Sequence, residues 1–135
     1  MRKLIITVFL FVSSMISNSN ADGHAIKMGI ILGFTGPIES LTPAMAASAE
    51  LAFKEASDSG SLLGGKYISV TRADSTCVDS AAAVTAAEGL VSGGTVAIMG
   101  ADCSGVTGAI AEKVAVPNGV VMISPSATSP GLTDI

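Results

Sequence analysis

The sequence predicts an α/β fold built on a doubly wound parallel sheet that the chain leaves incomplete. Four short apolar segments alternate with three longer segments of helical periodicity. The connections between the apolar segments are long enough for helical crossovers, so the strands should run parallel. The chain stops a few residues after the fourth apolar segment, so we expect the sheet's next edge to lack its neighbours.

The first strand and helix come directly after the N-terminal region. Residues 27–33 form a short apolar run bounded by glycine, which is typical of a strand buried on both faces. Gly36 and Pro37 then break the run. Over 43–57 apolar residues recur at three- and four-residue spacing, and a proline at position 43 suits an early helical turn.

The second strand and helix follow a glycine-rich loop. Polar and apolar residues alternate over 66–74, which predicts a strand. Asp79 or Ser80 can cap the next helix, whose alanine-rich body ends at the glycine pair 93–94.

The last predicted elements are a strand, a helix and a strand. Residues 95–100 form the third apolar strand, and Ser104 can cap the third helix. The sequence Pro-Asn-Gly at 117–119 ends that helix, and residues 120–123 form the fourth strand.

The first 21 residues have the pattern of a secretory signal peptide. Arg2 and Lys3 form a basic start, residues 4–12 are almost entirely apolar, and Ser-Asn-Ala at 19–21 supplies small residues for cleavage. The apolar run is too short for a membrane span, which needs about 20 residues. We therefore expect residues 1–21 to be removed and residues 22–135 to be released into the periplasm.

Composition excludes several classes of function. The chain has seven Lys and Arg against eleven Asp and Glu, and two of the basic residues belong to the predicted signal peptide. The remaining basic residues are scattered, which argues against a nucleic-acid partner. The only histidine, His24, lies in the terminal region, and the chain has no G-x-S-x-G, Walker or G-x-G-x-x-G motif at the appropriate position. We expect no enzyme activity, no metal and no cofactor.

Two loops at the predicted carboxyl edge of the sheet are candidates for ligand binding. Ser104, at the head of the third helix, can donate to a ligand carboxylate or simply cap its own helix. The loop 124–128 is rich in small hydroxyl residues, and Pro125 should leave its backbone groups free for a ligand, although a plain turn is the alternative. Asp102 is interpreted as a solvated rim acid or a helper cap.

The two cysteines favour a disulfide. An even number of cysteines in an exported chain makes a bridge between Cys77 and Cys103 the first interpretation, with two separate buried thiols as the alternative.

Four motifs together resemble the periplasmic leucine/isoleucine/valine-binding proteins, the substrate-binding components of ABC importers for branched-chain amino acids. They are G-I-I-L-G-F-T-G-P at 29–37, Cys77, the pair Cys103-Ser104, and V-M-I-S-P-S-A-T-S-P at 121–130. The resemblance implies a flavodoxin-like lobe of a type I periplasmic binding protein. In that family two such lobes close on the ligand, so residues 22–135 would be part of the N-terminal lobe. It also implies that a disulfide joins the two cysteine-bearing loops.

The resemblance also assigns roles to residues. The carboxylate-binding hydroxyls fall on Ser104 and on Thr128, whose N–H would also contact the ligand, and the carbonyl that accepts the ligand's ammonium group falls on Ser126. Leu41 stands where well-known members place an aromatic residue against the ligand's apolar chain. The ligand would be a branched-chain or other aliphatic amino acid, although relatives bind amides, urea or aromatic acids.

The complete protein would be a monomer that delivers its ligand to a membrane permease. One alternative is a sensory or regulatory ligand-binding domain of the same fold. A second alternative is an enzyme of flavodoxin-like architecture.

Overall fold

The computed structural model describes residues 25–135, so the predicted signal peptide at 1–21 and His24 lie outside the described residues. The strands are β1 (Ala25–Leu32), β2 (Tyr67–Asp74), β3 (Ala97–Gly100) and β4 (Val121–Ile123). The helices are α1 (Thr42–Asp58), α2 (Ser80–Ser92), α3 (Ser104–Ile110) and α4 (Val116–Asn118), with a π-helical turn at Ala111–Ala115. Short 3₁₀ turns lie at Leu62–Gly64 and Pro130–Leu132.

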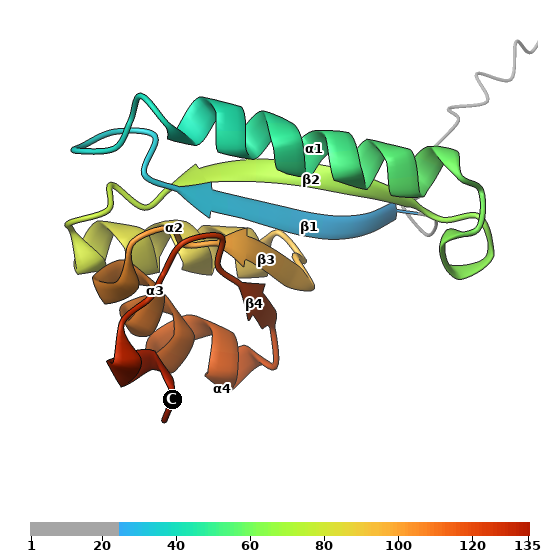
Figure 1. The fold of residues 1–135 in the computed structure, drawn as a ribbon. Helices are drawn as coiled ribbons and strands as arrows, with labels where there is room; N and C mark the ends of the chain where they lie inside the picture. Colours follow the sequence, from blue (N-terminus) through green and yellow to red (C-terminus); the bar gives the residue numbers. More distant parts are fainter. Residues whose placement is uncertain (1–24) are drawn as a thin grey trace, which may run out of the picture.

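The strands form one parallel sheet in the order β2-β1-β3-β4. Figure 1 shows α1 on one face of this sheet and α2, α3 and α4 on the other. The predicted doubly wound fold is therefore confirmed. Strand order reverses between β1 and β3, because the chain steps from β1 to one side and then returns to the other. In such sheets ligands bind at the carboxyl ends of the strands, beside this reversal.

The core is divided between the two faces of β1. Ile30 and Leu32 face α1 and pack with Ala46, whereas Ile31 faces α2 and α3 and packs in a larger cluster that includes Ile98. All three β1 side chains are fully buried. An uninterrupted apolar run is what a strand covered on both faces requires.

The helix ends refine two of the sequence predictions. Asp79, not Ser80, caps α2, because its carboxylate accepts from the N–H groups of Ala81 at 2.9 Å and Ala82 at 3.0 Å. The prediction that Ser104 caps α3 is wrong. Cys103 occupies the cap position without a side-chain cap bond, and Ser104 is the first helical residue.

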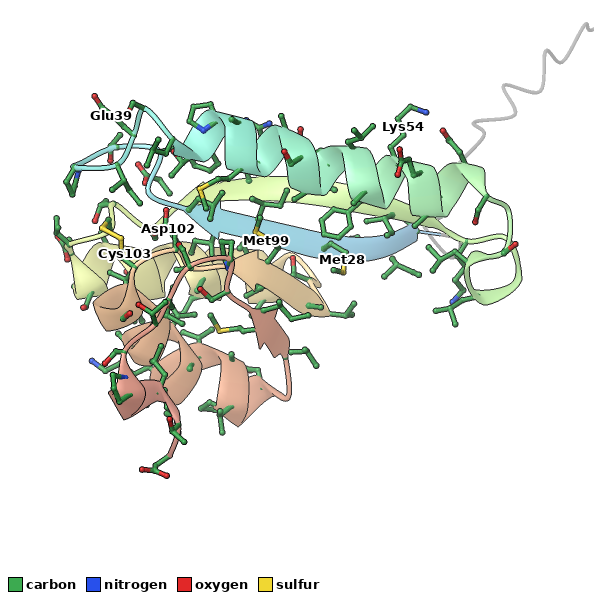
Figure 2. All side chains as sticks on the ribbon, in the orientation of Figure 1. Met28, Glu39, Lys54, Met99, Asp102 and Cys103 are labelled. Atoms are coloured by element: carbon green, nitrogen blue, oxygen red, sulfur yellow. A yellow bond between two sulfur atoms is a disulfide. The ribbon has the colours of Figure 1, made fainter. Side chains whose placement is uncertain are left out.

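Part of one sheet face is open to solvent. Beside α1, an apolar groove of about 290 Å³ runs over β3 and β4. Met28 and Met99, labelled in Figure 2, belong to its lining. On β4 itself Val121 and Ile123 are largely exposed. Within residues 25–135 there is no helix with the length and apolarity needed to span a membrane.

Candidate ligand-binding site

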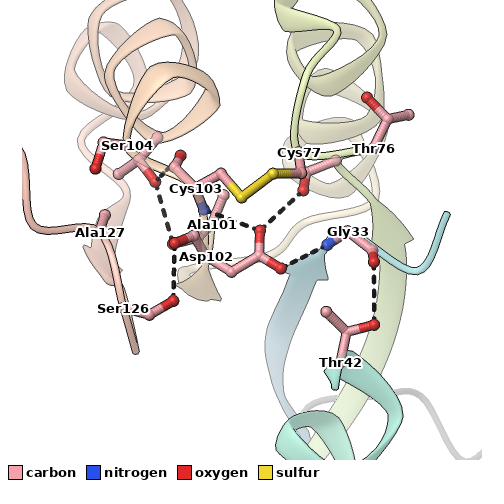
Figure 3. Close-up of a disulfide and its surroundings, with 12 residues drawn as sticks. Gly33, Thr42, Thr76, Cys77, Ala101, Asp102, Cys103, Ser104, Ser126 and Ala127 are labelled. Carbon is pink, nitrogen blue, oxygen red and sulfur yellow. Dashed lines mark hydrogen bonds between the residues drawn. A yellow bond between two sulfur atoms is a disulfide. The ribbon is translucent and has the colours of Figure 1, made fainter. Parts of the chain in front are cut away.

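The loops after β1, β2 and β3 meet at the reversal in strand order. A disulfide joins Cys77, after β2, to Cys103, after β3, with their Cα atoms 5.2 Å apart. The loop after β1 passes so close that a Cβ atom at Gly33 would lie 3.2 Å from the Cβ atom of Cys77. Glycine at position 33 thus permits the close approach of these loops, which Figure 3 shows around the disulfide.

The loop after β4 is held against the start of α3 by serine hydroxyls. Ser104 Oγ accepts from the N–H groups of Thr128 at 3.0 Å and Ser129 at 3.1 Å. Ser124 Oγ accepts from the N–H groups of Ser126 at 3.3 Å and Ala127 at 2.8 Å. The expectation that this loop leaves its N–H groups free is therefore wrong for residues 126–129 in this structure. Local serines already satisfy all four groups.

Within residues 25–135, hydroxyl donors and a carbonyl acceptor remain unused in the two loops. Ser124 donates to the carbonyl of Ala101, and Ser126 donates to the carbonyl of Asp102 at 2.8 Å. The O–H groups of Ser104 and Thr128 donate to no partner within residues 25–135, because the two N–H bonds to Ser104 use only its acceptor capacity. The Ser126 carbonyl likewise accepts no hydrogen bond from the described residues. The loops thus expose unpaired hydroxyl donors beside an unpaired carbonyl acceptor.

Asp102 is not the solvated rim acid that the sequence suggested. Its side chain is only 3% exposed. Its carboxylate accepts from the N–H of Gly33 at 2.8 Å, the N–H of Cys103 at 3.0 Å and the hydroxyl of Ser75 at 3.3 Å. Three donors from three loops remove this carboxylate from solvent, so it forms part of the frame beneath the site (Figure 3).

Asp74 organises the neighbouring strand end. Its carboxylate accepts from the hydroxyl of Thr35 at 2.6 Å and from the N–H of Thr76 at 2.8 Å. Burial favours the neutral acid, but these bonds together with backbone N–H donors of the loop after β1 outweigh it and lower the pKa of Asp74. The carboxylate therefore fixes the loops after β1 and β2 to each other.

The structure brings together three of the four predicted contact residues. Ser104 is half-buried and Ser126 and Thr128 are exposed on the facing loop. Leu41 lies in the loop ahead of α1 with its side chain 60% exposed, and no hydrogen bond links it to the other three. A groove of about 430 Å³ is lined by Ser104 and Ser129 but by neither Ser126 nor Thr128. The candidate site is thus an open surface.

Two serines that support the site were not assigned this role from the sequence. Ser75 was not singled out, and Ser124 was expected only as part of the candidate loop 124–128. Their signal in the sequence is position alone, since a small hydroxyl residue at a strand end is also an ordinary turn residue. Within residues 25–135 no cluster of His, Cys, Asp and Glu is arranged to hold a metal ion.

Comparison with known proteins identifies the family. Residues 25–134 match the family described as periplasmic binding protein. The chain belongs to this family. The resemblance inferred from the motifs is confirmed, and the fold is that of a type I periplasmic binding protein.

Its relatives include amino-acid-binding proteins. The chain is 32% identical over 111 residues to the Leu/Ile/Val-binding protein BraC3 of Rhizobium johnstonii, covering 82% of this chain and 29% of that protein. The structure of the branched-chain amino acid transporter substrate-binding protein LivJ of Streptococcus pneumoniae, in complex with isoleucine, has a TM-score of 0.72 and 34% identity. That match covers 81% of this chain and 31% of that one.

A third relative is the ABC transporter substrate-binding protein of Desulfitobacterium hafniense in complex with Leu. It has a TM-score of 0.68 and 29% identity, over 82% of this chain and 31% of that one. This member of the periplasmic binding protein family therefore spans less than a third of the length of each of these relatives.

Proposed function

We propose that residues 22–135 form part of the N-terminal lobe of a solute-binding protein that captures a branched-chain or other aliphatic amino acid in the periplasm. In this proposal residues 1–21 are the cleaved signal peptide. The protein catalyses no reaction, works as a monomer, and delivers its ligand to the membrane permease of an ABC importer. The isoleucine and leucine complexes of the two relatives support this choice of ligand.

The observation that carries the proposal is the set of hydrogen-bonding groups left unpaired in two adjoining loops. The hydroxyls of Ser104 and Thr128 can donate to the two oxygens of an α-carboxylate, and the carbonyl of Ser126 can accept from an ammonium group. Donors beside an acceptor match the two ends of a zwitterion. Bonds to charged ligand groups are also the stronger ones.

Leu41 is proposed to contact the apolar side chain of the ligand. Its side chain is 60% exposed in the loop that leads from β1 to α1. Figure 1 places this loop at the same end of the sheet as the loops after β3 and β4. An aliphatic residue offers apolar contact without the ring stacking that an aromatic ligand would prefer.

Titration of the isotope-labelled chain with isoleucine, leucine or benzoate, followed by nuclear magnetic resonance, tests the proposal. We expect the two amino acids to shift the amide signals of Ser104 and residues 126–128, and benzoate to shift them less because it lacks the ammonium group. Ser104→Ala should weaken isoleucine binding at least about tenfold, the cost of one hydrogen bond to a charged group.

Ser48→Ala provides the matched control, because Ser48 is an exposed serine on α1 and does not line the groove beside Ser104. It should bind isoleucine like the parent chain. Amino-acid-induced shifts that avoid residues 104 and 126–128, or an equal response in Ser104→Ala, would place the ligand elsewhere.

A further inference from the structure

Asp102 is hydrogen-bonded to every loop at the carboxyl edge of the sheet. Its carboxylate accepts from Gly33 after β1, from Ser75 after β2 and from Cys103 before α3. Its backbone carbonyl accepts from the hydroxyl of Ser126 after β4 at 2.8 Å. Figure 3 shows these contacts converging on the one residue. A single aspartate thus sets the spacing of all four loops.

Among the residues that the structure describes, no basic side chain forms an ion pair with this buried carboxylate. The ion pairs among residues 25–135 join Lys54 to Asp58 and Arg72 to Glu50, so Asp102 relies on hydrogen bonds alone. Burying an unpaired charge opposes folding unless donors surround it. The arrangement is therefore a costly way to gain stability, and its distinctive result is the fixed geometry of the loops.

The three donors require an acceptor-only side chain. Oδ2 accepts from Gly33, while Oδ1 accepts from both Ser75 and Cys103. In either orientation, an asparagine side chain would present its NH₂ group either to the N–H of Gly33 or to the donors of Ser75 and Cys103. Replacing Asp102 by asparagine keeps the size of the side chain but places a donor against a donor.

We propose that Asp102 is a positioning residue for the ligand site, holding Ser104 and the loop 124–129 in register for binding without touching the ligand. This inference rests on the proposed function, which supplies the ligand. Its path runs from the carboxylate to Cys103, next to Ser104, and from the Asp102 carbonyl to Ser126. The Asp102 carbonyl is retained when the carboxylate is lost, but residues 102 and 103 are then no longer held in place, so both loops should loosen with them.

The test measures backbone order in the full chain by nuclear magnetic resonance relaxation. In Asp102→Asn the order parameters of residues 126–129 should fall from about 0.85 to below about 0.6. Asp74→Asn is the matched control, because Asp74 also joins two loops at a strand end but has no bond to the loop after β4. It should leave residues 126–129 rigid.

Urea unfolding of each variant measures its free energy of unfolding. A loss of order in residues 126–129 can then be distinguished from a general loss of stability. Residues 126–129 that stay rigid in Asp102→Asn, or that loosen equally in Asp74→Asn, would overturn the proposal. Should Asp102→Asn fail to fold, Ser75→Ala replaces it, since that variant removes one donor and keeps the charge. It should loosen residues 126–129 partially, and unchanged order would again overturn the proposal.

Isoleucine titration of the same samples separates this proposal from the proposed function. We expect Asp102→Asn to abolish the isoleucine-induced shifts and Asp74→Asn to keep them. A parent chain that shows no isoleucine-induced shifts, together with loops that loosen only in Asp102→Asn, would refute the ligand and support Asp102 as the residue that positions the loops.

Discussion

At the scale of single residues, hydroxyl groups determine what the candidate site can bind. The oxygens of Ser104 and Ser124 accept hydrogen bonds from the N–H groups of residues 126–129, so all four amides have partners in this structure. Among the groups that remain are the hydroxyls of Ser104 and Thr128. In the proposed site, a substitution at either one would therefore remove half of the expected carboxylate contacts.

The disulfide gives the first prediction at this scale. Replacing Cys77 and Cys103 together by serine should lower the free energy of unfolding by about 3.5 kcal/mol, the loop-closure entropy expected for a bridge across 26 positions. Urea unfolding of the parent and the double variant would measure the difference. Equal free energies of unfolding would mean that the bridge does not reduce the conformational entropy of the unfolded chain.

Asp74 gives a prediction about pH. Its pKa is lower in the folded chain than in the unfolded chain, so the unfolded state takes up the proton first as the pH falls. The stability contributed by Asp74 is thus fully present above about pH 4 and is lost as the pH falls below that value. Asp74→Asn should flatten the decrease in urea midpoint between pH 5 and pH 2, two values chosen to bracket about pH 4. An unchanged decrease would assign acid sensitivity to other carboxylates.

Only part of the candidate site could be predicted from the sequence. Ser104, Ser126 and Thr128 were predicted because the resemblance assigns them, and the structure brings them together. The bonds of Ser104 were not predictable, because its partners lie 24 and 25 positions further along the chain. Asp102 was misjudged for the same reason. Its donor Gly33 lies 69 positions away, and nothing nearby in the sequence indicates burial.

At the scale of elements, periodicity was sufficient to predict every strand and the three main helices. The observed bounds of the strands differ from the predicted ones by at most a few residues. The differences lie at the ends of the elements, where fraying and capping shift a boundary by one or two residues. The π-helical turn at Ala111–Ala115 was not predicted, since its apolar spacing continues that of α3. The predicted third helix is observed as α3, this π-helical turn and α4. Gly119 ends α4 in the left-handed region, whereas Pro117, which was expected to end the helix, lies inside α4.

The cap of α2 gives a prediction for an element. Asp79→Ala removes the acceptor for the N–H groups of Ala81 and Ala82, so the free energy of unfolding should fall by about 1 kcal/mol. The control is Asp58→Ala at the end of α1, where the exposed pair with Lys54 contributes at most about 0.5 kcal/mol. Thermal or urea unfolding would compare the two. Equal losses would mean that capping adds nothing beyond an exposed ion pair.

At the scale of the whole molecule, the order of strands places the site. The sequence predicted parallel strands but not their order, because the order is set by which face each crossover covers. With β1 and β3 adjacent, the loops bearing Cys77, Cys103 and Ser126 converge on one edge. The same arrangement leaves the face over β3 and β4 open beside α1, where Val121 and Ile123 meet solvent.

The exposure of the site predicts the affinity of the chain for its ligand. Ser126 and Thr128 are exposed and Leu41 is 60% exposed, so a bound amino acid would keep much of its surface in water. Charge contacts made at high dielectric are weak, and an apolar side chain left in water contributes little. The dissociation constant for isoleucine should therefore be on the order of 1 mM, near the weak end of measurable binding. Isothermal titration of a monomeric sample would measure it, and a micromolar value would mean that these loops enclose the ligand more completely than their exposure allows.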